Sequence, residues 1–261
     1  MVCFLRSMIR ILLVVLCACA SMHAQPVFDT CGMEGSAVRS DVRLLNQKKN
    51  RYDLPSLDQI NRNVDFVTLL TSRENPRSFR EGDAIEIVAY IEEIKLGAIE
   101  SVNCGSKDAW HRDAHIELTI NPMQTGVKEH LLIAEVTPRL RQIMRERGVD
   151  WSQQALVDKF KGRWVKVRGW AFYDAMHDDE SAGSGSSRIW RGSPWEIHPV
   201  TSIEVTTKPA NLPTLPPITS QGSPPSQPTA ASRQCEGTTK TGNRCKRTVK
   251  PPARYCYQHG A

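Results

Sequence analysis

After its first 24 residues the chain lacks any apolar run long enough to cross a bilayer, so we expect no transmembrane span in the mature protein. In the first 24 residues, Arg6 and Arg10 precede the apolar run "ILLVVLCACA" and the small and polar residues "SMHA". This order is typical of a secretory signal. We expect an exported protein, periplasmic or extracellular, cleaved after Ala24 or Ala20. The alternative is a lipoprotein modified at Cys19, because "LCAC" resembles a bacterial lipobox.

The chain also lacks the common short catalytic motifs. It contains no HExxH, no G-x-S-x-G, no Walker loop and no zinc-deaminase signature. The Arg and Glu arrangement of a staphylococcal-type nuclease is not recognisable either. We therefore favour a protein that is not an enzyme, and a catalytic site of another kind stays open.

Cysteines are scarce in the body of the chain. Of the eight, three lie in the signal (Cys3, Cys17 and Cys19) and three lie near the C-terminus (Cys235, Cys245 and Cys256). Only Cys31 and Cys104 remain. A leftover pair in an oxidising compartment forms a disulfide more often than a site, although spacing alone does not show that the two meet.

The body also lacks an excess of positive charge. The formal net charge is +6, but residues 233–261 alone contain seven basic residues and one acid, Glu236, and the signal adds Arg6 and Arg10. Residues 25–232 are therefore slightly acidic. The basic pI describes the ends of the chain and gives no argument for nucleic-acid binding by the body.

Composition divides the chain into five parts: a signal peptide (1–24), a polar N-terminal segment (25–79), a β-rich body (80–206), a Pro-rich linker (207–232) and a basic Cys/His module (233–261). In the second part, Ser56 and Gln59 have capping-box spacing and predict one helix that continues through Val67. The linker contains seven prolines and almost no large apolar side chains, so we expect it to be extended.

The body alternates between apolar and polar residues with the period of a strand. The predicted strands are "DAIEIVAYIEEI", "AHIELTI", "HLLIAEV", "RWVKVRGWAFYD" and "SPWEIHPVTSIEV", and two short helices, "PRLRQIMRER" and "WSQQALVDKF", lie between the third and fourth. This order is typical of the OB fold, a five-stranded barrel with its helix between strands three and four. We therefore predict a mainly β, OB-like barrel with one or two short helices and a small zinc-knuckle-like tail. A generic antiparallel sandwich would show the same alternation.

The C-terminal module carries four N/S ligands: Cys235, Cys245, Cys256 and His259. A closed Cys3His set suits tetrahedral Zn²⁺ in a structural site, one ion per chain. A segment this short with few apolar residues cannot fold by burial alone, so the metal would supply most of its folding free energy. An unstructured basic tail and a partly disulfide-bonded tail are the alternatives.

Basic side chains surround these ligands: Lys240, Arg244, Lys246, Arg247, Lys250 and Arg254. With Tyr255 and Tyr257 they are suited to gripping phosphates and stacking on bases. They suit an anionic lipid or polysaccharide surface equally well. The partner therefore stays open between nucleic acid and another anionic polymer or surface, and the oligomeric state is open too.

Two segments resemble known bacterial sequences. "CEGTTKTGNRCKRT" and "YCYQHG" resemble a short C-terminal Cys-Cys-Cys-His module without an established activity, which implies metal binding. "KKNRYDLP", "VAYIEEIKLGAIESVNC", "DAHIELTI", "AEVTPRL", "RGWAFYDAMH" and "RGSPWEIHPVTSIEV" resemble an uncharacterised family of exported bacterial proteins with a WEIHPVT-x-IEV motif. The second resemblance runs from about Lys49 to Val205. It departs from the family at Ala114, where an aromatic residue is expected, and it implies domain boundaries but no mechanism.

A second polar site is suggested by Asp113, His115, His177 and His198 in the body. Together with Glu117 and Glu135 they have the residue types of a metal centre. His111, Asp113, His115 and Glu117 share one face of the second strand, which is also how a solvated strand face looks. We favour solvated or hydrogen-bonded residues over a metal centre. We expect His198 to bond a backbone group.

The fourth predicted strand alternates aromatic and basic side chains on one face: Trp164, Lys166, Arg168, Trp170 and Phe172. Such a face suits single-stranded nucleic acid. We favour packing of the tryptophans beneath the N-terminal segment.

The sequence therefore predicts an exported, non-catalytic binding protein. The alternatives are a metal-dependent hydrolase with a His/Asp site on the barrel, and a cell-envelope scaffold.

Overall fold

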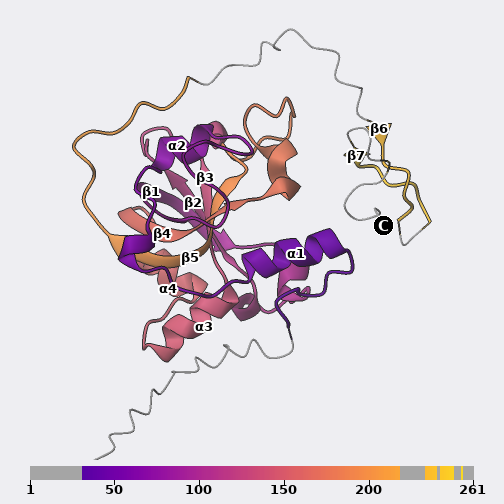
Figure 1. The fold of residues 1–261 in the computed structure, drawn as a ribbon, viewed down its shortest axis with the longest axis horizontal. Coiled ribbons are helices and arrows are strands. Elements are labelled where there is room, and N and C mark those ends of the chain that lie inside the picture. The colour runs from indigo at the N-terminus through magenta and orange to yellow at the C-terminus, as the bar shows by residue number, and fades with distance from the viewer. Residues whose placement is uncertain (1–30, 218–232, 240–241, 250–253, 255–261) are drawn as a thin grey trace, which may run out of the picture.

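The body of the chain is a closed five-stranded barrel in a computed structural model that describes residues 31–217, 233–239, 242–249 and 254 (Figure 1). Its strands are β1 (Ala84–Leu96), β2 (Ala114–Thr119), β3 (Leu132–Val136), β4 (Trp164–Tyr173) and β5 (Trp195–Val205). The strand order is β1-β2-β3-β5-β4, and β4 closes onto β1. Only the β3–β5 pair is parallel among these five strands. The predicted mainly β, OB-like five-stranded barrel is confirmed.

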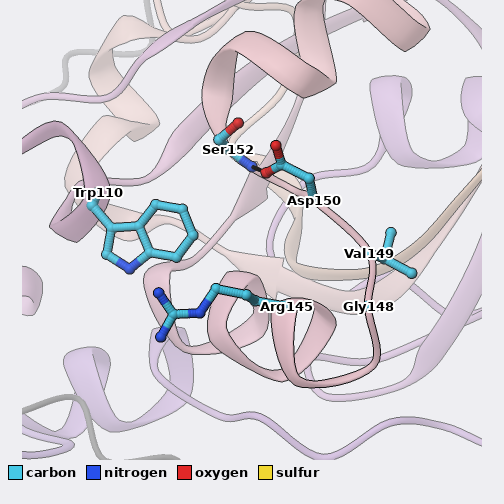
Figure 2. Close-up of a pocket in the computed structure, with 6 residues that line it drawn as sticks. All are labelled: Trp110, Arg145, Gly148, Val149, Asp150 and Ser152. Carbon is cyan, nitrogen blue, oxygen red and sulfur yellow. Dashed lines mark hydrogen bonds between the residues drawn. The ribbon is translucent and has the colours of Figure 1, made fainter.

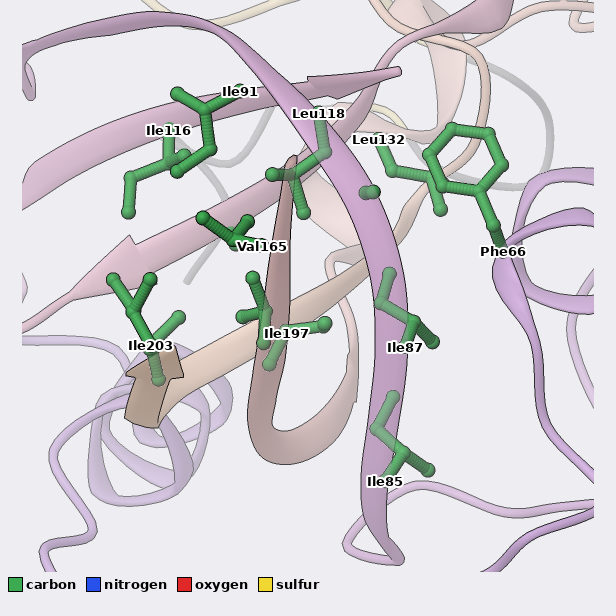
Figure 3. Close-up of a cluster of buried hydrophobic side chains, with 14 of the residues drawn as sticks. Phe66, Ile85, Ile87, Ile91, Ile116, Leu118, Leu132, Val165, Ile197 and Ile203 are labelled. Carbon is green, nitrogen blue, oxygen red and sulfur yellow. The ribbon is translucent and has the colours of Figure 1, made fainter. Parts of the chain in front are cut away.

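Alternate side chains of each strand fill the barrel (Figure 3). The core contains Ile85, Ile87 and Ile91 from β1, Ile116 and Leu118 from β2, Leu132 from β3, Val165 from β4, and Ile197 and Ile203 from β5. These residues are at most 7 % exposed. Because successive side chains of a strand point to opposite faces, the residues between them point outward.

The close approach of β4 to β5 at Gly169 depends on the glycine. At Gly169 the pairing of β4 with β5 shifts register. A Cβ at this position would lie 2.4 Å from the carbonyl oxygen of Pro199 and 2.5 Å from a side-chain carbon of Ile197. Only glycine allows the two backbones to approach this closely.

Four α-helices surround the barrel in the described part of the chain: α1 (Ser40–Lys49), α2 (Phe66–Thr71), α3 (Pro138–Glu146) and α4 (Gln153–Phe160). In Figure 1, α2 lies near one end of the barrel, and α3 and α4 lie near the other. The two helices predicted between strands three and four are α3 and α4. Five short 3-10 turns lie in the connections: η1 (Leu57–Gln59), η2 (Ser101–Asn103), η3 (Ala109–His111), η4 (Lys128–His130) and η5 (Ala175–Glu180).

The helix predicted to run from Ser56 through Val67 is broken. The capping box of Ser56 and Gln59 forms, but it begins only the 3-10 turn η1. Ile60 then leaves the helical path and makes a β-bridge with Ala84. A new helix, α2, begins after Asp65, whose carboxylate accepts the backbone N–H of Thr68 at 2.7 Å.

Helix α3 begins with a side-chain cap. The hydroxyl oxygen of Thr137, which is 1 % exposed, accepts the backbone N–H of Leu140 at 3.3 Å. We expect Thr137→Ala to lower the free energy of unfolding by ~1 kcal/mol, because that N–H would be left without its acceptor. Chemical denaturation measures the change. Thr125→Ala, on an exposed loop, is the matched control and should alter stability by less than about 0.5 kcal/mol.

The N-terminal segment is joined covalently to the β1–β2 connection. Cys31 and Cys104, the predicted pair, form a disulfide with their Cα atoms 5.8 Å apart. Asn50 follows α1 and donates its side-chain N–H groups to the carbonyl oxygens of Met33 (2.9 Å) and Val102 (3.0 Å). These contacts hold α1 beside η2.

The first part of the predicted linker packs on the barrel. Leu212 and Leu215 contact the hydrophobic core, and a ring nitrogen of His130 lies 3.0 Å from the carbonyl oxygen of Pro216. These contacts place the first part of the predicted linker against the barrel. The remaining linker residues, 218–232, lie outside the described residues.

A small two-stranded sheet lies in the C-terminal module. Strand β6 (Arg233–Gln234) pairs antiparallel with β7 (Thr248–Val249).

The signal peptide, Cys19 included, lies outside the described residues. In the segments that the structure describes, no helix has the length and apolarity needed to span a membrane.

Candidate functional site

A cluster of charged and polar side chains is buried on the outer face of β2, β3 and β5. Because Ala114, Ile116 and Leu118 fill the barrel, His115 must point outward from β2. The same rule points Glu135 outward from β3, and Glu196 and His198 outward from β5. We call Asp113, His115, Glu135, Glu196 and His198 the polar cluster. All five are at most 8 % exposed.

Glu135 is the centre of the polar cluster. It lies opposite His115 in the β2–β3 pairing, and its Oε1 is 2.9 Å from Nδ1 of that histidine. Its Oε2 is 3.1 Å from Nδ1 of His198. One carboxylate therefore contacts two imidazoles, and each histidine presents its Nδ1 atom to an acid.

Glu196 connects the polar cluster to a buried arginine. Its Oε2 lies 3.3 Å from Nδ1 of His198, and its Oε1 accepts an N–H from Arg191 at 2.5 Å. Arg191 is fully buried and also donates to the carbonyl oxygen of Ser193 at 2.9 Å. Removal of one member of such a buried pair leaves an uncompensated charge, which is strongly destabilising.

Asp113, the residue just before β2, is the member of the polar cluster that does not lie on a strand. Its Oδ2 accepts an N–H from Asn103 at 2.9 Å. Its backbone oxygen accepts the N–H of Gly97 at 2.8 Å. The buried Arg141 of α3 holds the preceding turn by donating to the carbonyl oxygens of Trp110 and Arg112. Asp113 therefore has a fixed position. Its Oδ1 atom is buried and has no hydrogen-bond partner among the described residues.

Burial and mutual contacts shift the pKa values of several residues in the polar cluster. Burial raises the pKa of Asp113 to about 7, and the nearby Glu135 carboxylate adds to the rise. Burial alone would raise the pKa of Glu135, but hydrogen bonds from His115 and His198 hold it well below its usual range. Burial alone would lower the pKa of His198, but its hydrogen bonds with Glu135 and Glu196 raise it to about 10.

Two segments that are distant in sequence from β2 and β3 cover the polar cluster: the end of α1 and the β4–β5 connection. Lys49, the last residue of α1, places its Nζ atom 2.8 Å from Asp174 and 3.7 Å from Glu100. The same Nζ lies 5.5 Å above the ring of Phe172, and that ring lies 5.4 Å from the ring of His198. Lys49 therefore lies next to Phe172, a residue that contacts the polar cluster through His198.

The β4–β5 connection forms the rest of the cover. The indole of Trp190 contacts the rings of His115 (5.5 Å) and His177 (5.7 Å). The carboxylate of Glu180 contacts Nδ1 of His177 at 2.9 Å and accepts the indole N–H of Trp190 at 2.6 Å. Trp190 of this connection therefore covers His115 on the outer face of β2.

Of the four residues predicted for a second polar site, the structure brings three together. Asp113, His115 and His198 belong to the polar cluster, whereas His177 is half-buried and lies beyond Trp190. Asp113 and His115 are buried and not solvated, but both are hydrogen-bonded, to Asn103 and Glu135, which is the other form of the favoured interpretation. The expectation that His198 bonds a backbone group is wrong, because its Nδ1 atom faces Glu135 and Glu196 and its Nε2 atom has no hydrogen-bond partner among the described residues.

Sequence reasoning did not find Lys49, Asp174, Arg191 and Glu196. Strand alternation was a signal for Glu196, which lies two residues before His198 and therefore on the same face of β5. The other three lie outside the strands, where no periodicity marks them.

The aromatic and basic face of β4 is partly covered by the N-terminal segment, as favoured. Trp170 is 6 % exposed, donates its indole N–H to the carbonyl oxygen of Asp53 at 3.1 Å, and lies 3.4 Å from the guanidinium of Arg51. Arg168 is paired with Glu86 at 2.5 Å. Trp170 therefore has no exposed ring face wide enough for a base to stack on.

Two surface cavities lie outside the polar cluster. One of about 440 Å³ is lined by Trp110, Arg145, Gly148, Val149, Asp150 and Ser152 (Figure 2). In it the guanidinium of Arg145 lies 5.1 Å from the Trp110 ring. Another of about 350 Å³ is lined by Glu92, Lys95, Glu117, Gly126, Lys128, Leu131 and Trp190. No residue of the polar cluster lines either cavity.

The C-terminal module brings two of its predicted ligands together. Cys235 and Cys245 are buried and form one cluster with Val249. Sγ of Cys235 accepts the backbone N–H of Gly237 at 3.3 Å. Arg244, Lys246, Arg247 and Arg254 are exposed, and Arg254 pairs with Glu236 at 2.6 Å. The predicted ligands Cys256 and His259, and the predicted contacts Lys240 and Lys250, lie outside the described residues.

Comparison of the chain with protein-family models, with curated proteins and with solved structures gave no match.

Proposed function

We propose that this chain is an exported, non-catalytic binding protein that contacts an anionic polymer through its C-terminal module. In this proposal the barrel is the rigid body that carries the module. The observation that carries it is the arrangement of Arg244, Lys246 and Arg247, which are exposed around the buried Cys245. Cations displayed on a small fixed scaffold bind phosphates or carboxylates by releasing counterions.

The proposed cofactor is one structural Zn²⁺ held by Cys235, Cys245, Cys256 and His259. Two observations support it. The side chains of Cys235 and Cys245 lie together in one buried cluster. The N–H of Gly237 also points at Sγ of Cys235, as expected for a sulfur that carries negative charge. Zn²⁺ bound by three thiolates would hold the basic side chains in place.

Export is part of the same proposal. The disulfide between Cys31 and Cys104 supports it, because disulfides persist in oxidising compartments. The resemblance of the body to exported bacterial proteins stays a prediction.

A salt titration tests the binding function. With a single-stranded oligonucleotide as probe, the affinity should fall steeply as salt rises. Replacing Arg244, Lys246 and Arg247 together with Gln should reduce the slope of log K against log salt by about 2, because each lost phosphate contact removes about 0.7. A chelator that removes Zn²⁺ should have a comparable effect.

The matched control is the triple variant Lys107→Gln, Lys159→Gln and Lys208→Gln. It removes the same charge from exposed positions outside the module. Equal slopes for the two triple variants would show that only net charge matters and would contradict the proposal. A polygalacturonate probe in parallel separates a nucleic-acid partner from an acidic polysaccharide.

A metal-dependent hydrolase is the alternative that one observation favours. Ligand atoms of Asp113, Glu135 and His198 lie within 4.8 Å of one another. Hydrolysis needs an open coordination position and access for the substrate. All three residues are buried and are covered by α1 and the β4–β5 connection. The geometry therefore favours binding over catalysis.

A further inference from the structure

We propose that the polar cluster binds one divalent metal ion inside the protein, through Asp113, Glu135 and His198, with Glu196 as a fourth donor. This site is separate from the proposed zinc site of the C-terminal module, and it does not depend on the proposed function.

The donor atoms have the spacing of ligands around a single ion. One ligand atom from each of Asp113, Glu135 and His198 lies within 4.8 Å of the others. Nδ1 of His198 is 3.1 Å from Oε2 of Glu135 and 3.3 Å from Oε2 of Glu196. Two donors at ~2.1 Å from a tetrahedral ion are separated by ~3.4 Å. Small side-chain movements would therefore admit a metal.

An unpartnered buried atom independently indicates a missing ligand. Asp113 is 3 % exposed, and Asn103 bonds only its Oδ2. Its Oδ1 atom has no hydrogen-bond partner among the described residues. A buried acceptor without a partner costs ~1–3 kcal/mol, and more when it is charged. Coordination to a metal would satisfy this oxygen.

The formal charges of the metal-binding form also favour a cation. Asp113, Glu135 and Glu196 are three carboxylates, Arg191 contacts Glu196, and Lys49 is already engaged by Asp174 and Glu100. Without a metal, His198 supplies positive charge by keeping its proton, but a histidine that binds a metal ion must be neutral. Buried charges are paired or bound to metals, and a divalent ion that takes the place of this proton would neutralise the remaining two negative charges.

His115 has the position of a residue that orients a metal ligand. Its Nδ1 atom lies 2.9 Å from Oε1 of Glu135, the oxygen that does not face His198. Hydrogen bonds of this kind hold ligating carboxylates in place. The hydrogen bond from Asn103 would serve Asp113 in the same way.

The donor set indicates which class of ion binds. Carboxylate oxygens with one imidazole and no thiolate suit Mn²⁺ or Zn²⁺. The site is enclosed, so the ion would be structural, and it would connect the residue before β2 with β3 and β5.

The test uses the full chain with Cys235→Ser and Cys245→Ser, so that the C-terminal module keeps only two of its four proposed ligands, Cys256 and His259. Mn²⁺ or Zn²⁺ is supplied during expression and, in parallel, during refolding, because a buried site exchanges slowly. After desalting we expect one equivalent of metal per chain and a melting temperature above that of the chelator-treated protein. A folded protein without stoichiometric metal would overturn the proposal.

Asp113→Asn is the decisive variant, because it keeps the shape of the side chain and removes its charge. We expect its metal affinity to fall by more than the ~10–100-fold that follows loss of a hydrogen-bond partner of a ligand, because Asp113 is itself a ligand. Glu117→Gln is the matched control: Glu117 lies in β2, the strand that follows Asp113, but its side chain pairs with Lys95 and does not belong to the polar cluster. It should bind metal like the parent. Equal affinities of the two variants would contradict the site.

A spectroscopic measurement covers the case in which Asp113→Asn does not fold. Bound Mn²⁺ in the parent should show magnetic coupling to a ¹⁴N nucleus, because one ligand is an imidazole. Absence of nitrogen coupling would place the ion elsewhere and overturn the assignment. Loss of Zn²⁺ from the C-terminal module would not change any of these results, so this proposal and the proposed function fail independently.

Discussion

Lys49→Met is expected to lower the free energy of unfolding by about 3–5 kcal/mol, the usual cost of leaving one partner of a buried ion pair alone. Asp174 is fully buried, and its Oδ2 lies 2.8 Å from Nζ of Lys49. Methionine fills a similar volume but cannot balance that carboxylate. Because Lys49 ends α1, its loss also loosens the helix from the barrel. Chemical denaturation monitored by tryptophan fluorescence gives the change.

The neighbouring residue provides the control. Lys48 is also paired with an acid, Glu81, but the side chain of Lys48 is 52 % exposed. Exposed pairs contribute about 0–1 kcal/mol, so Lys48→Met should be nearly neutral. The double variant Lys49→Met/Asp174→Asn should recover much of the loss, because it removes the uncompensated charge. Equal effects of Lys49→Met and Lys48→Met would show that the buried pair has no special role.

The pH dependence of this pair has a defined sign. Burial would raise the pKa of Asp174, but the positive charges of Lys49, His177 and Arg191 together outweigh it and lower the pKa to about 2. A folded-state pKa below the unfolded value gives stability that is present above about pH 4 and is lost as the pH falls through about 2. The contribution corresponds to about 2 kcal/mol. The wild type should lose it on acidification, and Asp174→Asn should not.

The barrel could be predicted from the sequence because its signal is local. Strand β1 alternates Ile85, Ile87 and Ile91 with polar residues, and the structure buries those three in the core. The position of α3 and α4 between β3 and β4 then distinguished an OB-like barrel from other all-β orders.

Helix α1 could not be predicted, because its own sequence has little apolar periodicity. Leu44 in its middle is 60 % exposed, while Asn46 and Lys49 are buried. The helix is held by polar contacts: the side chain of Asn46 donates to the backbone oxygen of Glu34 and to the hydroxyl of Ser101. Such contacts join residues far apart in sequence and leave no periodic pattern.

The sequence predicted which strand face His115 lies on, but not which residues cover that face. Alternation correctly placed His115 outward from β2, and its side chain was expected to be solvated or hydrogen-bonded, but alternation does not say which. Whether an outward face is covered depends on Lys49 and Trp190, which arrive from α1 and from the β4–β5 connection. No local pattern shows that these residues return to the same face. The acids on β3 and β5 are recognised as its partners only when the β3–β5 pairing is known.

The disulfide gives the second large effect. Replacing Cys31 and Cys104 with Ser should lower the free energy of unfolding by about 4 kcal/mol, because the bond closes a loop across a sequence separation of 73 residues. Chemical denaturation should show a lower midpoint for the Ser variant, and reductant should shift only the wild type. A reductant-sensitive Ser variant would mean that other cysteines are responsible.

Removing the disulfide should also affect the polar cluster, through the position of Asp113. Asn103, the residue before Cys104, donates the hydrogen bond that fixes Oδ2 of Asp113 at 2.9 Å. On the other side of the bond, the carbonyl oxygen of Cys31 accepts an N–H from Arg139 of α3 at 2.6 Å. If these contacts position Asp113, the Ser variant should bind metal in the barrel more weakly than the wild type under conditions where both are folded. Unchanged metal affinity would show that Asn103 holds its position without the covalent bond.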